Sequence, residues 1–302
     1  MKTVSVILTT YNSAEYIQKT VDSILNQKGI GDDFNLELIA VDDSSSDNTP
    51  EILKQNKLIL LSTETNSGGP NRGRNLGIKK STGDYICIAD HDDEWHENKI
   101  SVLLPYLELC PIVTSGYTVI NKVTGKKIMK VSDSSESHVL YKSNQTFIGK
   151  LTKSLKSQNT YLGSIIYNAT LRDVLFEEHF GVVDYDWVLR LFHENSSIEV
   201  CSSLYNRYVD NKNLSLDESY RAKDFYYSLL FIERYEELYP REVSISNKRI
   251  HGSRARYFYM TNEMKKARKY FLKSQLSWKT IAYYITSYFG STYVKDNFEV
   301  FG

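Results

Sequence analysis

The sequence predicts an α/β protein with a mostly parallel sheet flanked by helices and a helical appendage at the C-terminal end. Over the first hundred residues, short β-branched runs alternate with amphipathic segments. These runs are apolar throughout, as in parallel strands that helices cover on both faces. After residue 217 the chain carries helical patterns only. We therefore expect a first domain at residues 1–215 and a helical region at 216–302.

Four strand–helix pairs account for the first hundred residues. The run VSVILT at 4–9 is too short and too β-rich for a buried helix. A segment that begins at Ser13 has apolar residues at helical spacing, and Thr49-Pro50 is typical of a helix start. The strands are predicted at 4–9, 36–41, 58–62 and 85–89, and the helices at 13–25, 49–56, 75–80 and 97–109.

The pattern changes after residue 110. Residues 111–130 resemble an antiparallel hairpin, because two β-rich runs flank the turn KVTGKK. A helix is expected at 184–193, followed by strands near 197–201 and 204–209. The C-terminal helices should break near Pro240, Thr261 and Ser277.

Composition excludes several classes of protein. Thirty-seven basic and 37 acidic residues give a net charge of zero, which argues against a nucleic-acid partner. The three cysteines, at 87, 110 and 201, are odd in number and far apart, so we expect neither a disulfide framework nor a zinc ribbon. The N-terminal segment does not resemble a signal peptide, and no apolar run reaches the roughly 18 residues of a membrane span. We expect a cytoplasmic protein.

Polar side chains follow each of the four predicted strands. In open parallel sheets, ligands bind beyond the carboxyl ends of the strands. The residues at these ends are Thr9, Thr10, Tyr11 and Asn12; Asp42 and Asp43; Asn66 to Pro70 with Arg72 and Arg74; and Asp90, His91, Asp92 and Asp93. The three carboxylates at 90, 92 and 93 would repel one another without a cation among them. Oxygen ligands without cysteine favour Mg²⁺ or Mn²⁺.

Two further segments have both a functional and a structural interpretation. Residues 68–75, GGPNRGRN, lack the Lys-Ser/Thr of a P-loop, so they indicate either an anion site at a helix start, with Arg74, or a surface turn. No G-x-G-x-x-G follows the first strand, which disfavours a dinucleotide-binding fold. Asp184 and Asp186 begin a helix beside Trp187, and such acids can simply stabilise the helix dipole.

Four segments, in this order, resemble the family 2 glycosyltransferases: SVILTTYNSAEYIQKTVDSILNQ, LIAVDDSSSDNT, RGRNLGIKKSTGDYICIADHDDEW and VDYDWVLRL. The family consists of inverting enzymes with the GT-A fold, a Rossmann-like arrangement, that use nucleotide-activated sugars. The resemblance covers roughly residues 2–215. It implies a nucleotide-sugar donor, with a UDP-sugar as the default, and a glycan or lipid-linked acceptor in bacterial surface polysaccharide synthesis.

The resemblance also implies a base-binding pocket at the ends of the first two strands. Tyr11 would lie against the nucleobase, and the Asp43 carboxylate would accept a hydrogen bond from uracil N–H. The other residues that the resemblance assigns to this pocket are Thr9, Thr10, Asn12 and Asp42.

The remaining site residues follow from the same motifs. Arg74 would approach the donor or its diphosphate. Asp90-His91-Asp92 corresponds to the D-x-D signature: Asp92 would bind Mn²⁺ or Mg²⁺ directly, Asp90 would lie nearer the ribose or the metal's waters, and His91 would adjoin the donor. Asp184 falls on the family's general base. One carboxylate for a metal and one for a base are the minimum for the displacement.

The sequence departs from the family pattern at two places on the acceptor side. Val183 replaces the usual Glu before the base, and residues 207–215, RYVDNKNLS, carry Asp210 where the family has His. Two other functions compete with this one. A sugar nucleotidyltransferase would need a Gly-rich loop with Arg and Lys after the first strand, which TYNSAE does not provide. A sugar-nucleotide-binding protein without activity would be expected to have lost the metal or base carboxylates, and none is lost.

The C-terminal region has its own charge pattern. Residues 248–279 contain ten Lys or Arg residues and one acid, Glu263. The uncharged, tyrosine-rich segment 281–294 follows, too short to span a bilayer but suited to its interface. This pattern predicts a peripheral contact with anionic lipid at the inner face of the plasma membrane. A structural cap or a homodimer contact is the alternative, since such helices also pack in cores and interfaces.

Overall fold

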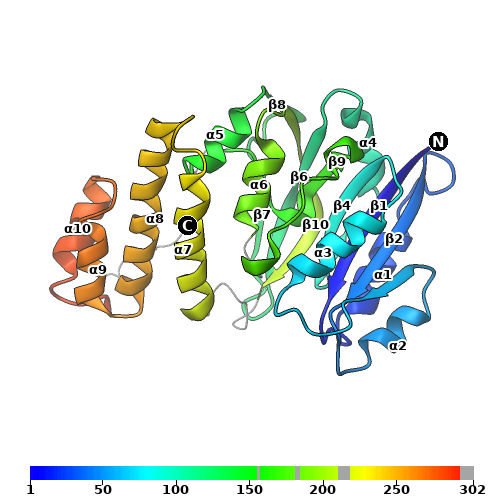
Figure 1. Ribbon diagram of the computed structural model, residues 1–302, viewed down its shortest axis with the longest axis horizontal. Coiled ribbons are helices and arrows are strands. Elements are labelled where there is room, and N and C mark those ends of the chain that lie inside the picture. The colour runs from blue at the N-terminus through cyan, green and yellow to red at the C-terminus, as the bar shows by residue number, and fades with distance from the viewer. Residues whose placement is uncertain (155–156, 181–183, 210–217, 293–302) are drawn as a thin grey trace. The chain divides into compact units, whose positions relative to one another are not determined.

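The computed structural model describes residues 1–154, 157–180, 184–209 and 218–292, in two compact units (Figure 1). Unit 1 comprises Met1–Phe147 and Lys156–Leu216, and unit 2 comprises Ile148–Leu155 and Asp217–Gly302. The sequence did not predict that Ile148–Leu155 would group with the C-terminal helices.

The described strands of unit 1 form one sheet in the order β3-β2-β1-β4-β9-β6-β10-β5, with β7 beside β6 and β8 beside β10. The pairs β3–β2, β2–β1, β1–β4 and β6–β10 are parallel, whereas β4–β9, β9–β6, β6–β7, β10–β8 and β10–β5 are antiparallel. The strands are β1 (Lys2–Thr10), β2 (Phe34–Asp42), β3 (Ile59–Ser62), β4 (Tyr85–Asp90), β5 (Asp93–Trp95), β6 (Ile112–Asn121), β7 (Lys127–Lys130), β8 (His138–Tyr141), β9 (Ile165–Asn168) and β10 (Ser197–Val209).

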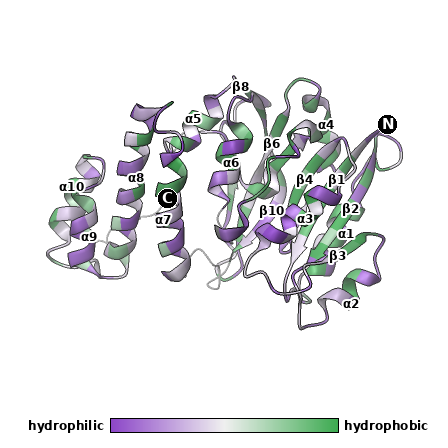
Figure 2. Ribbon diagram, viewed as in Figure 1, coloured by the Kyte–Doolittle hydropathy of each residue, from purple (hydrophilic) through white to green (hydrophobic). Residues whose placement is uncertain are grey.

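Helices cover both faces of this apolar sheet (Figure 2). The helices of unit 1 are α1 (Ile17–Leu25), α2 (Thr49–Lys54), α3 (Pro70–Lys80), α4 (Lys99–Leu107), the first part of α5 (Gln145–Leu151), and α6 (Tyr185–Phe192). Val4, Val6 and Leu8 of β1 pack with α1 and α4 on one face. On the other face α3 lies close to β1. A Cβ atom added to Gly77 of α3 would lie only 2.4 Å from the Ile7 side chain of β1.

The predicted mostly parallel sheet with flanking helices is confirmed, and the expected hairpin is the antiparallel pair β6–β7. Three details differ. Helix α3 begins at Pro70, five residues earlier than predicted, because proline suits the first turn of a helix. The two strands expected at 197–209 are one strand, β10, with register shifts near Ser203. Strands β5, β8 and β9 were not predicted.

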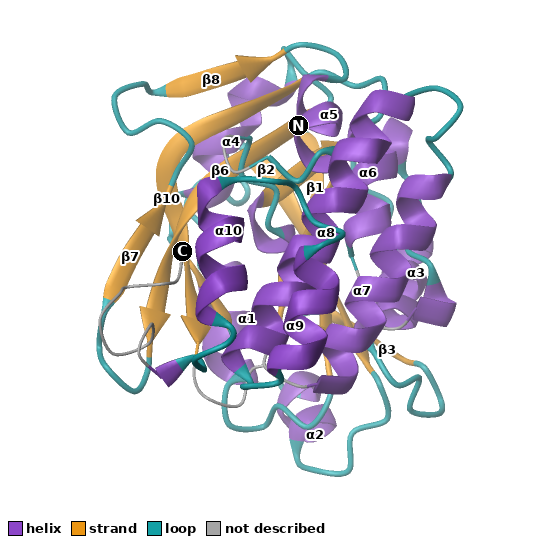
Figure 3. Cartoon of the chain, turned by 90° about the vertical axis from the view of Figure 1, so that its left-hand side faces the viewer, coloured by secondary structure: helices purple, strands orange, loops and turns teal. Residues whose placement is uncertain are grey.

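Unit 2 contains α7 (Glu218–Glu233), α8 (Pro240–Met260), α9 (Met264–Phe271) and α10 (Trp278–Thr286) (Figure 3). The predicted breaks near Pro240, Thr261 and Ser277 are confirmed, although α9 already ends at Phe271, six residues before Ser277. Its small core joins residues of α8 and α9, namely Ala255, Phe258, Tyr259, Ala267 and Phe271. No helix in the described ranges is long and apolar enough to cross a membrane.

Candidate active site at the carboxyl edge of the parallel strands

Two buried carboxylates at the end of β2 organise the loops around them. Asp42 accepts hydrogen bonds from the Ser45 amide at 2.9 Å and from the Ser45 hydroxyl at 2.6 Å. Asp43 accepts from the Thr63 hydroxyl at 2.6 Å and from the Ser67 amide at 3.1 Å. All these donors are neutral, so this pair of carboxylates sits in a cradle of hydroxyl and amide groups.

The end of β1 adjoins the same cradle. Thr10 pairs in register with Asp42, and its buried hydroxyl oxygen has no hydrogen-bond partner among the described residues. Asn12 has a φ angle of 47°. Its backbone N–H donates to the Ser45 hydroxyl, and its side-chain Oδ1 accepts from the Ser46 backbone N–H, both at 2.9 Å. Tyr11 between them is 47% exposed, so its ring is available to a ligand.

Arg74 reaches the end of β4 from the first half of α3. Its guanidinium lies 2.9 Å from Asp90 and donates at 3.2 Å to Asn71, while its buried Nε has no acceptor among the described residues. It also stacks on Phe176, with 5.2 Å between the guanidinium carbon and the ring centroid. The sequence placed Arg74 at this edge, and the structure brings it directly to Asp90.

The acids that follow β4 lie close enough to disfavour one another's charge. Burial raises the pKa of the Asp92 carboxyl; His91 opposes the shift and Asp90 adds to it. Burial also raises the pKa of Asp93 well above its usual range, and both Asp90 and Asp92 act in the same direction. The Asp93 Oδ2 atom is buried without a hydrogen-bond partner in the described chain.

These carboxylates fit a hard divalent cation. Their mutual repulsion and the orphaned Asp93 oxygen are the features that a bound cation would relieve. Within the described ranges, no three His, Cys, Asp or Glu side chains are arranged to hold a metal by themselves. A metal at Asp90 and Asp92 would therefore need further oxygen ligands from a bound phosphate.

The two acids at the start of α6 have different surroundings. Asp186 is almost fully buried and pairs with Arg190 at 2.8 Å. Asp184 occupies the N-cap position, is only partly buried, and makes no side-chain capping bond. Val183, and Asp210 farther along, lie outside the described residues.

Tyr161 connects Asp184 with the acids of β4. Burial raises the pKa of Tyr161; the charges of Asp90, Asp93 and Asp184 act in the same direction, and Arg207 opposes the shift. The Arg207 guanidinium lies over the Tyr161 ring at 4.4 Å from its centroid. Sequence reasoning missed both residues; the register of β10 with β5, which pairs Arg207 with Asp93, is a tertiary feature.

A loop before α6 ties the two sides of the site together. Asn75 of α3 donates to the Phe176 carbonyl at 2.9 Å and accepts from its amide at 2.8 Å. Phe176 stacks on Trp187 of α6 with ring centroids 4.5 Å apart and an interplanar angle of 8°. Because Arg74 stacks on Phe176 as well, the Phe176 ring contacts both Arg74 and Trp187 in the first turn of α6.

The parallel sheet with polar strand ends and carboxylates after β4 defines an α/β protein of the GT-A type. The chain belongs to Glycosyl transferase family 2, whose sequence profile matches residues 5–179, more than half of the chain. The predicted membership of this family is thereby confirmed; the matched residues include the first three motifs and end before the fourth, VDYDWVLRL.

Individual relatives agree with this family. The chain is 38% identical over 110 residues to poly(ribitol-phosphate) beta-N-acetylglucosaminyltransferase TarP of Staphylococcus aureus, covering 35% of this chain and 33% of TarP. It is 32% identical over 165 residues to the putative teichuronic acid biosynthesis glycosyltransferase TuaG of Bacillus subtilis, covering 52% of this chain and 63% of TuaG. The chain therefore spans less than two thirds of either relative.

Among solved structures, the crystal structure of S. aureus TarS 1–349 in complex with UDP has a TM-score of 0.67 and 19% identity, covering 100% of this chain and 94% of that one. The corresponding complex with UDP-GlcNAc has the same TM-score at 18% identity, with the same coverage. At this identity the similarity establishes the GT-A fold.

Proposed function

We propose that the chain is an inverting glycosyltransferase that moves a sugar from a UDP-sugar to a hydroxyl of a glycan or lipid-linked acceptor in bacterial surface polysaccharide synthesis. The observation that carries this proposal is the match to Glycosyl transferase family 2 together with the carboxylates that follow β2 and β4, where Asp90 pairs with Arg74 at 2.9 Å. The charges of Asp90 and Asp184 both act on Tyr161. A donor held at the β4 acids would then have a carboxylate available for its acceptor. A location at the cytoplasmic face of the membrane is part of the proposal.

The neutral cradle at the end of β2 suits a nucleobase. Asp43 would accept from uracil N–H while Thr63 and Ser67 hold the carboxylate in place, and the exposed Tyr11 ring would stack on the base. Thymine presents the same N–H, so dTDP-sugars are the competing donors.

The reaction needs a proton acceptor and a stabilised leaving group. Asp184 would take the proton of the acceptor hydroxyl as its oxygen bonds to the anomeric carbon, and the bond from that carbon to the diphosphate breaks on the opposite side, which inverts the centre. A Mn²⁺ or Mg²⁺ ion held by Asp90 and Asp92 would neutralise the diphosphate's developing charge. Arg74, 2.9 Å from Asp90, would add a fixed positive charge beside it.

Release of nucleoside diphosphate from UDP- and dTDP-sugars, with and without Mn²⁺ and with glycan and polyol-phosphate acceptors, tests this function. Asp184→Asn should lower transfer by at least about 10²-fold and leave donor binding unchanged. Asp186→Asn is the matched neighbour: it should lower stability by about 1–3 kcal/mol, because it weakens the buried pair with Arg190, and spare most of the activity. A mild Asp184→Asn and a crippling Asp186→Asn would overturn the base assignment.

The same assay separates the alternative functions. Donor binding without acceptor-dependent release would favour a sugar-nucleotide-binding protein. Pyrophosphate release from UTP and a sugar phosphate would favour a nucleotidyltransferase. The names of TarP and TuaG support an acceptor from the wall-polymer class, poly(ribitol-phosphate) or teichuronic acid.

We also propose that α10 contacts anionic membrane lipid. Its exposed apolar side chains include Trp278, Ile281 and Ile285, and Phe289 just beyond it is 82% exposed. The cluster of basic residues at 248–279 supplies charge complementary to anionic headgroups. A homodimer through the same face is the competing proposal.

Co-sedimentation of the full chain with phosphatidylglycerol vesicles tests the membrane contact. Trp278→Ser combined with Phe289→Ser should abolish salt-sensitive binding, whereas Leu238→Ser, which removes an equally exposed apolar residue elsewhere in unit 2, should not. Negligible binding by the wild type, with a dimer in solution that the double substitution dissociates, would favour the homodimer.

A further inference from the structure

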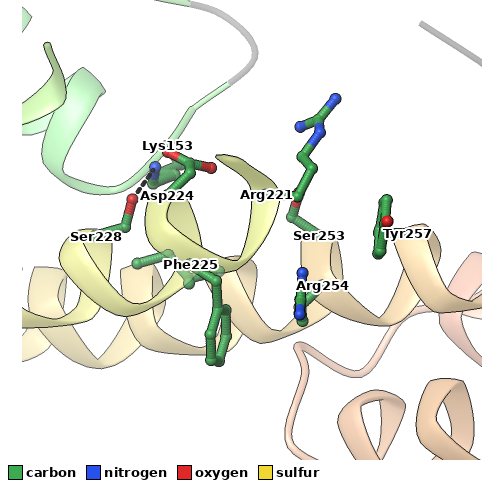
Figure 4. A pocket seen from close by; sticks show the side chains of 9 residues that line it. Lys153, Arg221, Asp224, Phe225, Ser228, Ser253, Arg254 and Tyr257 are labelled. Atoms are coloured by element: carbon green, nitrogen blue, oxygen red, sulfur yellow. Dashed lines mark hydrogen bonds between the residues drawn. The ribbon is translucent and has the colours of Figure 1, made fainter. Parts of the chain in front are cut away.

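Unit 2 contains a small pocket of about 60 Å³ that opens to solvent, away from any residue assigned above (Figure 4). Helix α7 contributes Arg221, Asp224, Phe225 and Ser228, which are spaced along one helical face. Helix α8 contributes Ile250, Ser253, Arg254 and Tyr257 at the same spacing, and Lys153 completes the lining. The pocket is therefore lined mainly by one face of α7 and one face of α8.

Arg254 is the unusual member of this lining. Its Nε and Nη1 atoms are buried without a hydrogen-bond acceptor among the described residues. The guanidinium is fixed between aromatic rings, with its carbon 4.5 Å from the Phe258 centroid and 5.2 Å from that of Tyr257. Buried donors without acceptors are costly, and cation–π contacts do not replace the missing hydrogen bonds. The pocket therefore lacks an acceptor that Arg254 requires.

The charges around the pocket favour an anion. Three cationic side chains line it, Lys153, Arg221 and Arg254, against a single acid, Asp224. In Figure 4, Asp224 lies at the same end as Lys153 and Ser228, whereas Arg221 and Arg254 lie at the other end with Ser253 and Tyr257. The arginine end thus carries two arginines and two hydroxyl groups, although the Arg221 guanidinium extends away from that of Arg254 and would have to turn to share a ligand with it.

Neighbouring acids do not fill this role in the structure. Glu263 is close enough to interact with Arg254, but it forms an ion pair with Lys266. Glu218, in the first turn of α7, interacts electrostatically with Tyr257 and Lys266. Both acids remain competitors for the arginine end if their side chains turn.

We infer that this pocket binds a phosphate-type oxyanion, with Arg254 and Arg221 as its charged donors and Ser253 and Tyr257 as its hydroxyl donors. Phosphate offers several oxygens around one centre, as this set of donors requires. The inference concerns unit 2 alone and does not depend on the proposed transfer reaction. The phosphate could belong to a free ion, to a phosphodiester polymer or to a lipid headgroup.

Calorimetric titration of the full chain with inorganic phosphate, at ionic strength held constant with chloride, tests the inference. Arg254→Gln and Arg221→Gln should each weaken phosphate binding at least about 10-fold, because each removes a charged donor. Lys248→Gln is the matched control: it removes one positive charge from an exposed position of α8 outside the pocket and should change the affinity less than about twofold. Phosphate bound at another site would be unaffected by all three substitutions.

Two further probes identify the source of the phosphate. Binding of glycerol-phosphate oligomers more tightly than inorganic phosphate, with the same dependence on Arg254 and Arg221, would assign the pocket to a phosphodiester polymer. Loss of phosphatidylglycerol-vesicle binding in both variants would assign it to lipid.

Equal binding of every probe by the wild type, Arg254→Gln and Arg221→Gln would overturn the inference. A loss of stability in Arg254→Gln with no change in phosphate affinity in either variant would overturn it as well. Arg221→Gln, at a partly exposed position, keeps the test decisive if Arg254→Gln does not fold.

Discussion

The acids at the end of β2 and those after β4 lie at the same edge of the sheet but are stabilised in different ways. Asp42 and Asp43 accept hydrogen bonds from neutral hydroxyl and amide groups. After β4, burial and the neighbouring acids raise the pKa of Asp92 and Asp93, and one Asp93 oxygen has no partner in the described chain. The first pair has its hydrogen bonds without a ligand, whereas the cations near the second group, Lys99 and Arg207, do not offset the effect of burial on the pKa of Asp92 and Asp93.

Because of this difference, the two groups of acids suit different parts of a nucleotide ligand. A carboxylate already held by neutral donors can recognise a further N–H group at little cost, which suits base recognition. Carboxylates that burial and repulsion destabilise gain most from a cation, which suits a metal and a diphosphate. The two groups should therefore respond differently to substitution and to chelation.

Asp92→Asn should produce the largest effect. We expect transfer to fall by at least about 10²-fold and UDP binding to become insensitive to a chelator, because the loss of a metal ligand removes the charge that stabilises the leaving group. Calorimetry with UDP, with and without Mn²⁺ and EDTA, measures this response. Tight UDP binding by the wild type that EDTA does not change would contradict the assignment of the β4 acids.

Asp43→Asn should act on binding alone. Losing a charged acceptor should weaken UDP binding about tenfold, while the response to Mn²⁺ persists. Asp47→Asn, in the same loop but bonded to Thr49 and Ala14, is the control and should change UDP affinity less than about twofold. If Asp43→Asn removed the Mn²⁺ response instead, the division between the two groups of acids would be wrong.

Motifs in the sequence predicted the polar edge of the sheet because it consists of residues that directly follow strands. Parallel strands bring their carboxyl ends together, so Thr10, Asp42, Asp90 and the helix with Arg74 were placed correctly from the chain order. The antiparallel half of the sheet gave no such signal. Its contribution depends on pairings between distant segments.

Tyr161 and Phe176 illustrate what sequence reasoning could not find. Neither residue follows a predicted strand or belongs to a recognised motif. Tyr161 matters because β9 and β10 pack beside β4 and β6, and Phe176 because Asn75 holds its backbone. Only the tertiary structure shows that they join the β4 acids to the start of α6.

Lys99 bears on the acids after β4, because it is a buried amine whose charge lowers the pKa of Asp93. Its amine donates to the Gly163 carbonyl at 2.5 Å and lies 3.3 Å from the Trp95 ring centroid, and burial lowers its pKa to about 7. In the unfolded chain the pKa returns to the usual 10.5, so between pH 7 and 10.5 the unfolded state binds more protons than the folded state. The free energy of unfolding should therefore rise with pH in this window.

Urea unfolding of the wild type and Lys99→Met between pH 7 and 9 measures the effect. The wild type should gain up to about 1.4 kcal/mol per pH unit relative to Lys99→Met, and the difference should level off below pH 7. A constant difference across this range would mean that Lys99 remains charged in the folded protein.

The smallest expected effect concerns the neutral cradle itself. The Ser45 hydroxyl donates to Asp42 at 2.6 Å and accepts from the Asn12 amide at 2.9 Å, so Ser45→Ala removes two hydrogen bonds that link β1 to β2. Water can replace part of the loss at this partly exposed position, and the Ser45 amide still bonds to Asp42. We expect a loss of about 0.5–1 kcal/mol in stability and a two- to fivefold loss in UDP affinity. Ser46→Ala is the matched control, because its exposed hydroxyl makes only a long 3.3 Å contact with Asn12 and should contribute almost nothing.

Thermal unfolding with and without UDP distinguishes the two variants. Equal effects at Ser45 and Ser46 would mean that the loop is held by its backbone hydrogen bonds and that the cradle does not depend on the Ser45 hydroxyl.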